Sequence, residues 1–255
     1  MAPLVYHLLL LSLLLPLCLA ADPNGQYCSD SYNGGQIRSN INYVLSDLVA
    51  KASVGGGFAI SSYGKGNNTI YGLAQCRGDV SEGDCSTCLT DAAKQLPLVC
   101  PGKSDARIWY DYCFMRYDTD NFVGQSDTSY ALILINVENA TNPEAFDKAV
   151  GKLMRKVEAD AVVPGNGGLG REEAKFTPYI TIYGLAQCTR DLQPLTCAQC
   201  LSAAVELFPD YCRFRKGCRV LYSSCTVRYE IYPFYFPLDG VVTSQGEYSK
   251  FIWHP

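Results

Sequence analysis

The octapeptide TIYGLAQC occupies residues 69–76 and recurs unchanged at residues 181–188. The same spacing of 112 residues holds without a gap from 69–118 to 181–230, and it aligns five pairs of cysteines. A repeat of this length indicates two copies of one structural unit. We therefore predict two tandem domains, over residues 22–126 and 129–240, each of about 110 residues. Residues 126–128 are the expected junction, and residues 241–255 form a tail.

The first 20 residues have the layout of a secretory signal peptide. An apolar run from Leu8 to Leu19 is followed by the small residues Ala20 and Ala21. About a dozen apolar residues are too few for a permanent transmembrane helix. No later apolar segment approaches the ~20 residues that a membrane span needs. The sequence therefore predicts cleavage after Ala20 and a secreted, extracellular protein without a membrane span.

Cleavage would also remove Cys18 and leave twelve of the thirteen cysteines. An even number of cysteines in an oxidising compartment predicts a disulfide framework. The Cys-x8-Cys-x2-Cys pattern of each copy is also compatible with a zinc site of four thiolates. The secretory route favours disulfides over zinc, and we expect no metal and no cofactor. Two sequons, at Asn67 and Asn139, are candidates for N-glycosylation in the same compartment.

The two copies differ in their sixth cysteine. The first copy begins with Cys28, whereas the second has no cysteine between Cys113 and Cys188 and carries Cys218 instead. This difference predicts a short disulfide from Cys212 to Cys218 in the second copy. Because a shorter loop stabilises less in the chain-entropy model, the second domain should depend more on its core.

The apolar patterns of both copies predict an α+β fold. Helical spacing of apolar residues predicts helices over residues 41–49, 85–96, 146–157 and 197–208. A strand leads into each TIYGLAQC motif. Alternation predicts one further strand per copy, over 107–117 and 219–229, with Trp109, Cys113 and Met115 on one face. Helices packed with a small antiparallel sheet define the α+β class.

Catalytic motifs are missing from the mature sequence. His254 is the one histidine after residue 20, whereas a Ser or Cys nucleophile usually needs a histidine base. The sequence has no Gly-x-Ser-x-Gly, His-Glu-x-x-His or phosphate-loop motif. We therefore expect a protein that is not an enzyme.

Charge and aromatic content indicate the kind of partner. The net charge of −4 gives no reason to expect nucleic acid or an anionic membrane. The 18 tyrosines suit stacking on sugars and contacts with proteins, so we expect a carbohydrate or protein ligand. An interdomain contact or an exposed patch is predicted for the cluster Tyr229, Tyr232, Phe234, Tyr235 and Phe236.

The duplicated Cys-x8-Cys-x2-Cys pattern behind TIYGLAQC, with RVLYSSCTVRYE at residues 219–230, resembles the plant cysteine-rich repeat secretory proteins. Their domains are similar to ginkbilobin, an antifungal, lectin-like seed protein. The resemblance covers nearly all of residues 22–240 and implies a five-stranded antiparallel sheet with two helices per domain. It also implies the disulfides Cys28–Cys100, Cys76–Cys85, Cys88–Cys113, Cys188–Cys197 and Cys200–Cys225.

The resemblance also implies candidate site residues. Ginkbilobin binds mannose through an Asn after the first cysteine, an Arg six residues before the last cysteine and a Glu five residues after it. The matching residues are Ser29, Arg107 and Asp118 in the first domain. The second domain has Arg219 and Glu230, with no counterpart of the Asn in sequence. An alternative interpretation makes the two arginines ion-pair partners of Asp118 and Glu230.

These features favour an apoplastic binding protein of plant defence or cell-wall signalling, carbohydrate-binding or antifungal in activity. One alternative is a protein–protein interaction module that partners membrane-bound relatives. Another is an enzyme acting on wall polymers, which would need two carboxylates about 5–10 Å apart.

Overall fold

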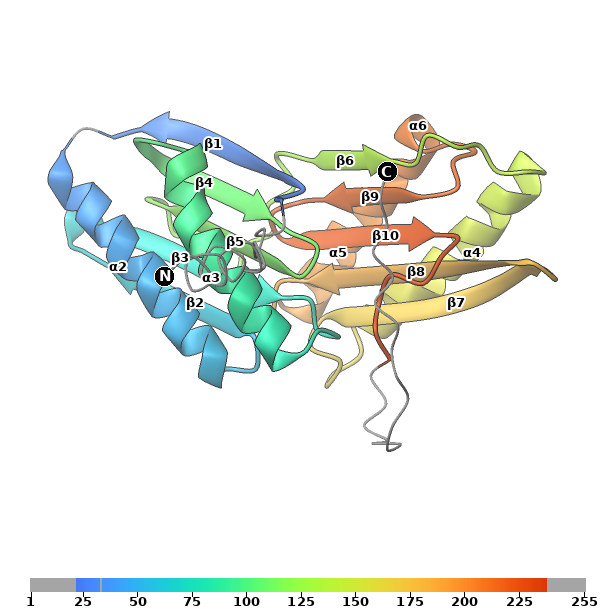
Figure 1. Ribbon diagram of the computed structural model, residues 1–255, viewed down its shortest axis with the longest axis horizontal. Coiled ribbons are helices and arrows are strands. Elements are labelled where there is room, and N and C mark those ends of the chain that lie inside the picture. Colours follow the sequence, from blue (N-terminus) through green and yellow to red (C-terminus); the bar gives the residue numbers. More distant parts are fainter. Residues whose placement is uncertain (1–21, 33, 238–255) are drawn as a thin grey trace, which may run out of the picture.

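The computed structural model describes residues 22–32 and 34–237 (Figure 1). The predicted signal peptide, Cys18, residues 238–240, the predicted tail and His254 lie outside the described residues. The chain forms two five-stranded antiparallel sheets, each covered on one face by helices. The predicted α+β class with two tandem domains is confirmed.

The two domains repeat one order of elements. The first contains β1 (Gly25–Ser31), α2 (Gly35–Val54), β2 (Phe58–Tyr63), the 3-10 helix η1 (Gly66–Asn68), β3 (Ile70–Cys76), α3 (Glu82–Val99), β4 (Lys103–Trp109) and β5 (Cys113–Asp118). The second contains β6 (Leu132–Ile135), α4 (Pro143–Ala161), β7 (Leu169–Thr177), β8 (Ile180–Cys188), α5 (Pro194–Glu206), α6 (Phe208–Tyr211), β9 (Cys218–Leu221) and β10 (Cys225–Glu230). The strand orders are β1-β4-β5-β3-β2 and β6-β9-β10-β8-β7, so the two sheets have the same topology.

In each copy, the segment that was predicted to be a single strand forms two strands joined by a tight turn. In the first copy, Trp109 at the end of β4 pairs with Phe114 in β5, and the N–H of Tyr110 donates to the carbonyl of Cys113 at 2.8 Å. The prediction of one strand over 107–117 is therefore wrong. The reversal leaves Trp109 on the opposite face from Met115. Alternation alone does not reveal a turn whose own residues are aromatic.

The second predicted helix of the second copy is also interrupted. It was expected to run through Phe208, but α5 ends at Glu206 and Phe208 begins the separate helix α6. Proline at the second position of α6 suits a helix start. A backbone N–H at that position would have no intrahelical partner, so no hydrogen bond is lost when proline lacks it.

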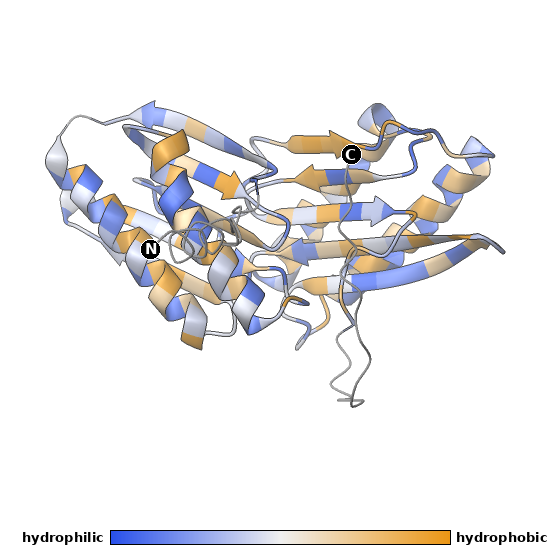
Figure 2. Ribbon diagram, viewed as in Figure 1, coloured by the Kyte–Doolittle hydropathy of each residue, from blue (hydrophilic) through white to orange (hydrophobic). Residues whose placement is uncertain are grey.

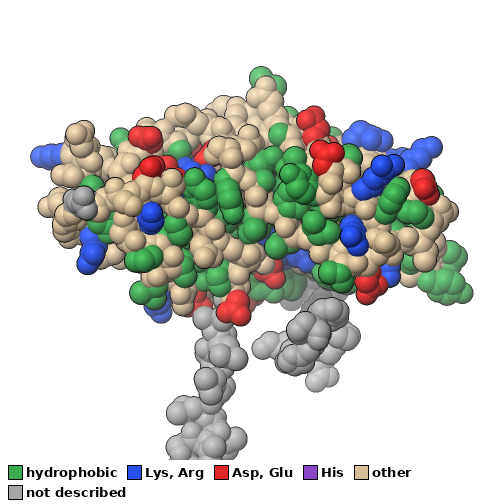
Figure 3. Space-filling view, turned by 90° about the horizontal axis from the view of Figure 1, so that it is seen from above, with side chains coloured by type: hydrophobic (Ala, Val, Ile, Leu, Met, Phe, Trp, Pro, Cys, Tyr) green, Lys and Arg blue, Asp and Glu red, His purple; other side chains and the backbone are tan. Residues whose placement is uncertain are grey.

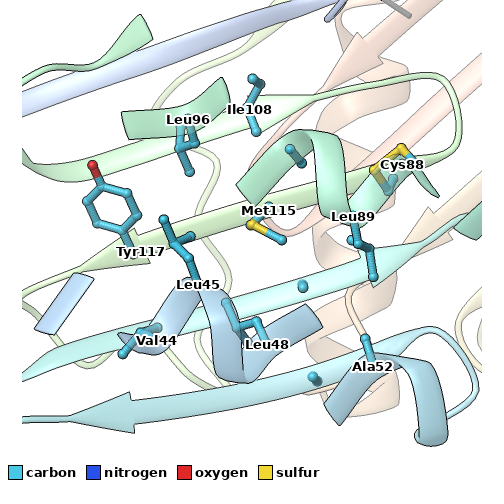
Figure 4. Close-up of a cluster of buried hydrophobic side chains, with 14 of the residues drawn as sticks. Val44, Leu45, Leu48, Ala52, Cys88, Leu89, Leu96, Ile108, Met115 and Tyr117 are labelled. Atoms are coloured by element: carbon cyan, nitrogen blue, oxygen red, sulfur yellow. A yellow bond between two sulfur atoms is a disulfide. The ribbon is translucent and has the colours of Figure 1, made fainter. Parts of the chain in front are cut away.

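The repeated motif forms an inner strand of each sheet, β3 in the first and β8 in the second, between the central strand and one edge strand. A glycine at its fourth position lets the first helix of the domain approach closely: a Cβ on Gly72 would lie 2.4 Å from Val44 and 2.9 Å from Leu48. Figure 4 shows apolar side chains of α2 and α3 meeting Ile108 and Met115 of the sheet. Hydrophobic and hydrophilic residues alternate along α2 and α4, as expected of helices with one buried side (Figure 2).

Six disulfides cross-link the chain, three within each domain. They are the five pairs implied by the resemblance, together with Cys212–Cys218. In the first domain Cys85 and Cys88 tie α3 to two different strands, through Cys76 in β3 and Cys113 in β5. The equivalent bonds in the second domain close loops of the same length, with sequence separations of 9 and 25.

The domains face in opposite directions. In Figure 1, α2 and α3 lie in front of the first sheet, whereas α4 and α5 lie behind the second. β1 and β6 both lie along the upper edge, so an approximate two-fold axis relates the domains. Seen from that side, hydrophobic side chains gather near the middle of the molecule (Figure 3). Near this edge the ring centres of Tyr130 and Tyr27 lie 4.6 Å apart.

Within residues 22–32 and 34–237, no helix combines the length and the apolar character needed to cross a membrane.

Candidate ligand-binding site

The structure places Ser29, Arg107 and Asp118 on the open face of the first sheet, away from α2 and α3. Tyr27 pairs with Arg107 across β1 and β4, and Ser29 lies two residues further along β1. Arg107 in turn pairs with Arg116 of β5, and Asp118 follows two residues later. The three predicted residues therefore lie on three adjacent strands.

The second sheet has the same arrangement with one unexpected member. Leu134 of β6 pairs with Arg219 of β9, so Asn136 takes the position that Ser29 has in the first domain. Glu230 ends β10, as Asp118 ends β5. The second domain thus presents Asn136, Arg219 and Glu230, and the expectation that it lacks a counterpart of the Asn is wrong.

Sequence reasoning missed Asn136 because no cysteine precedes it. In the first sheet Cys28 pairs with Ala106, whereas in the second sheet Ile135 pairs with Cys218. The cysteine has moved to the neighbouring strand, so an alignment anchored on cysteines finds nothing opposite Ser29. The sequence did contain one signal for this position. Cys218 stands where the first copy has Ala106, and it marks β9, the strand that pairs with β6.

Arg107 is buried and bound within the protein. Its guanidinium donates to both carboxylate oxygens of Asp105, at 3.3 and 3.1 Å. Nη1 lies 2.8 Å from the carboxylate of Asp127 and donates to the hydroxyl of Ser223 at 2.5 Å. The guanidinium also lies 4.9 Å from the centre of the Tyr27 ring. A ligand that reached Arg107 would have to displace groups from the junction and from the second domain.

Arg219 of the second domain makes the equivalent contacts with the first domain. Its Nη1 donates to Asp111 of the first domain at 2.5 Å, and its Nη2 donates to the carbonyl of Tyr110 at 3.1 Å. Burial lowers the pKa of Arg219 to about 10, and the nearby Arg228 acts in the same direction. The arginine remains charged at neutral pH and links the two domains.

Neither arginine pairs with the acid that sequence reasoning gave it. Asp118 is bound by Arg116 at 3.4 Å, and Glu230 is bound by Arg228 at 3.1 Å. The alternative interpretation of Arg107 and Arg219 as partners of these acids is therefore wrong. Both arginines belong to the domain interface instead.

Glu230 has an unusual environment. Burial raises its pKa, while Arg228, Tyr232 and Asn136 act in the opposite direction. Within the described part of the chain, Oε2 of Glu230 is buried and receives no hydrogen bond. Asn136 accepts the N–H of Glu138 through Oδ1 at 2.9 Å, and its amide lies near enough to Glu230 to lower the pKa of that carboxyl. A buried carboxylate oxygen without a donor loses its hydration without compensation, which agrees with the raised pKa.

Aromatic side chains from residues 231–237 flank Glu230. Arg228 lies 4.2 Å from the ring centre of Phe234 and donates to the hydroxyl of Tyr232 at 3.1 Å. The Tyr232 residue is 46% exposed, so its ring is accessible beside the carboxylate. The N–H of Phe236 donates to Asp79 of the first domain at 2.6 Å. The predicted aromatic cluster therefore includes both an interdomain contact and an exposed ring.

A small cavity lies behind this site, between the domains. It has a volume of about 60 Å³, and its lining includes Trp109 from the first domain and Arg219, Tyr222 and Phe234 from the second. This volume holds a few water molecules at most, because one water occupies about 30 Å³ in the liquid. A sugar ring would have to bind outside it.

The remaining predicted positions are at the surface. Asn67 lies in η1 and Asn139 lies after β6, and both are exposed. Among the residues that the structure describes, no three His, Cys, Asp or Glu side chains gather in a way that could hold a metal ion.

Comparison with known proteins identifies the family. Residues 23–120 and 135–232 each match the salt stress response/antifungal domain. The chain belongs to this family. It is 49% identical over 250 residues to cysteine-rich repeat secretory protein 55 of Arabidopsis thaliana, with 95% of each chain covered. The resemblance to the cysteine-rich repeat secretory proteins is thus confirmed.

Two further relatives of this salt stress response/antifungal protein bear on its function and fold. It is 40% identical to an antimicrobial ginkbilobin-2-like protein of Castanea crenata, over 89% of this chain and 94% of that protein. The tandem DUF26 ectodomain of the Arabidopsis thaliana cysteine-rich receptor-like protein PDLP8 superposes with a TM-score of 0.72. That match has 27% identity and covers 82% of this chain and 98% of that structure.

Proposed function

We propose that this chain is a secreted, non-enzymatic carbohydrate-binding protein of plant defence that acts in the apoplast. The observation that carries the proposal is the set Asn136, Arg219 and Glu230 on three adjacent strands of the second sheet. These are the residue types of the mannose site that the ginkbilobin resemblance implies. Similarity to a protein named as antimicrobial supports the defence role.

The chemistry of the three side chains suits sugar hydroxyl groups. The Asn136 amide carries N–H donors, and the carboxylate of Glu230 beside it carries acceptors. The exposed ring of Tyr232 offers a stacking surface for the apolar face of a sugar. Arg219 is bound to the first domain, so we assign it a positioning role beneath the site.

We assign the sugar to the second domain rather than the first. Ser29 lacks the amide donors of Asn136, and Asp118 is one methylene shorter than Glu230. The two sites otherwise occupy equivalent strand positions. The first-domain residues therefore serve as matched controls within the same chain.

The test is a glycan array probed with the mature protein and with four variants. Mannose-containing glycans should bind the wild type, and Asn136→Ala and Glu230→Gln should each weaken binding about tenfold or more. Ser29→Ala and Asp118→Asn should leave binding within about twofold. A blank array with folded protein, or equal losses in both domains, would overturn the proposed site. A fungal growth assay with the same variants tests the defence role.

Similarity to a receptor-like ectodomain favours a second candidate function, binding to a membrane-bound relative. The outer strands β2 and β7 each end a sheet and leave one edge without a strand partner in the described chain. Such edges can add a strand from another protein. Affinity purification from leaf apoplast and membranes tests this candidate, and a lysine substitution in β7 should remove any specific partner. Recovery of no specific partner would count against it.

A further inference from the structure

A second, larger cavity lies at the far end of the first domain, where β1 leads into α2 (left in Figure 1). Its volume is about 290 Å³, close to the lower limit of about 300 Å³ for small-molecule pockets. The lining residues that matter below are Tyr32, Arg38, Ile41, Asn42, Pro97 and Tyr117. None of them belongs to the candidate sugar site.

The cavity lies between the last turn of α3 and the first turns of α2. Pro97 lies in the last turn of α3, and the helix ends at Val99. The chain then turns through Gly102, whose φ of +71° suits glycine, and enters β4. The Cys28–Cys100 disulfide fixes this turn to β1. One wall of the cavity is therefore held covalently.

In the second domain, phenylalanine rings pack around the counterpart of Tyr117. Tyr229, the counterpart of Tyr117, has the Phe208 ring at 5.1 Å and the Phe146 ring at 6.3 Å. Phe146 in turn packs edge-on against Phe176 at 5.3 Å. All four rings contribute to one continuous core.

The first domain has a smaller side chain at the matching position. Leu96 stands where the second domain has Phe208, and Figure 4 places it beside Tyr117 and Leu45. No described aromatic ring stacks on Tyr117. Since close packing is the rule in protein cores, an unfilled volume in one of two homologous domains indicates space for a ligand.

The lining has one charge. Among the described residues that line the cavity, Arg38 is the only charged one, and none of them carries a carboxylate. Asn42 adds an amide, while Ile41, Pro97 and the tyrosine rings are apolar surfaces. We propose that this cavity binds a small organic acid with an apolar, ring-sized body, whose carboxylate pairs with Arg38.

The probe pair cinnamate and cinnamyl alcohol separates charge from shape, because the two share one body and differ in the carboxylate. Binding to the mature protein is measured by isothermal titration and by saturation-transfer NMR. Cinnamate should bind more tightly than the alcohol, and Arg38→Ala should remove most of that difference, a loss of about five- to tenfold. Arg155→Ala, an exposed arginine of α4, is the matched control and should change nothing.

A second variant tests the location. Asn42→Trp places a large ring at an exposed helix position on the rim, so it should block both probes while the melting temperature stays unchanged. If that variant is unstable, contacts from bound cinnamate to the Tyr32 and Tyr117 rings, seen as intermolecular NOEs, give the location instead. Absence of binding by wild type, or binding that survives Asn42→Trp in folded protein, would overturn the proposal. Sugar binding at Asn136 should be unaffected throughout.

Discussion

Gln75 and Gln187 occupy the same position in the two copies of the repeated motif, and each donates a hydrogen bond to the other domain. The acceptor in each case is the carbonyl of the cysteine that follows the other glutamine, at 2.8 and 3.2 Å. Their side-chain oxygens accept the N–H groups of Arg190 and Gly78, which are also 112 residues apart. The motif that forms an inner strand of each sheet therefore also joins the domains.

Arg107 and Arg219 follow the same symmetry. Arg107 donates to Ser223, and Arg219 donates to Asp111, which is the residue 112 positions before Ser223. Such reciprocal contacts are the signature of an isologous, two-fold interface. The tandem chain thus contains, within one polypeptide, the kind of interface that two separate copies would form.

Loss of either glutamine should destabilise the whole chain. Gln75→Ala or Gln187→Ala removes two interdomain hydrogen bonds and leaves buried backbone groups without partners. We expect each to lower the free energy of unfolding by about 2–4 kcal/mol, measured by urea denaturation. Gln26→Ala, an exposed residue of β1, should cost less than about 0.5 kcal/mol. Equal small losses at all three positions would contradict the role of the glutamines.

The motif glycines should differ in their tolerance of a methyl group. A Cβ on Gly72 would lie 2.4 Å from Val44, whereas a Cβ on Gly184 would lie no closer than 3.1 Å to any neighbour. Gly72→Ala should therefore cost about 1–3 kcal/mol more than Gly184→Ala, because the first forces α2 away from its sheet. Thermal unfolding of the two variants checks this. The prediction fails if Gly184→Ala is the more harmful change.

The disulfides Cys28–Cys100 and Cys212–Cys218 should contribute different amounts to the free energy of unfolding. Cys28–Cys100 closes a loop with a sequence separation of 72, whereas Cys212–Cys218 has a separation of 6. The chain-entropy model predicts that replacing the first pair by alanine costs about 2 kcal/mol more than replacing the second. Paired Ala variants compared by denaturant titration measure the difference. Cys76–Cys85 and Cys188–Cys197, with equal separations of 9, serve as controls and should give similar losses.

Glu230 should make stability fall as pH rises. Burial raises its pKa in the folded protein, so the folded state keeps this proton to a higher pH than the unfolded state does. Stability from this group is fully present below the unfolded pKa and declines until pH passes the folded pKa. Glu230→Gln removes that dependence, so the variant should gain stability relative to wild type as pH rises from the unfolded pKa of the carboxyl through its raised folded pKa.

Asp111 provides the opposite control for the pH experiment. Burial alone would raise its pKa, but Arg219, Arg228 and Asn24 together bring the pKa below its usual value. Its contribution to stability is therefore present above the unfolded pKa and is lost as pH falls. Asp111→Asn should lose stability relative to wild type most strongly at neutral pH. The same slope for both variants would contradict the two assignments.

Much of the fold could be predicted from the sequence because its signals are local. The spacing of 112 residues predicts two equal domains, and helical periodicity locates the helices that cover each sheet. Alternation failed at residues 107–117, where Tyr110 and Tyr112 continue an apolar pattern through a turn. Only the backbone pairing of Trp109 with Phe114 reveals the hairpin.

Some residues of the candidate site could likewise be predicted from the sequence, and others could not. The resemblance implies Arg219 and Glu230 through their distances to Cys225, because Glu230 lies on the same strand as that cysteine and Arg219 on the neighbouring one. Asn136 does not, since β6 is attached to its neighbour by hydrogen bonds rather than by a disulfide, and strand register is a tertiary property. Arg107 and Arg219 each donate to a partner in the other domain, Ser223 and Asp111, at separations that no sequence period predicts.

The sequence by itself determined the duplication around TIYGLAQC, the α+β class and the short Cys212–Cys218 bond, because each depends on residue spacing along one chain. The tertiary structure alone decided that the two copies face opposite ways, that Gln75 and Gln187 exchange hydrogen bonds, and that Asn136 stands beside Glu230. Those relationships depend on how separate surfaces pack and pair in space, and packing of distant segments leaves no periodic trace in the sequence.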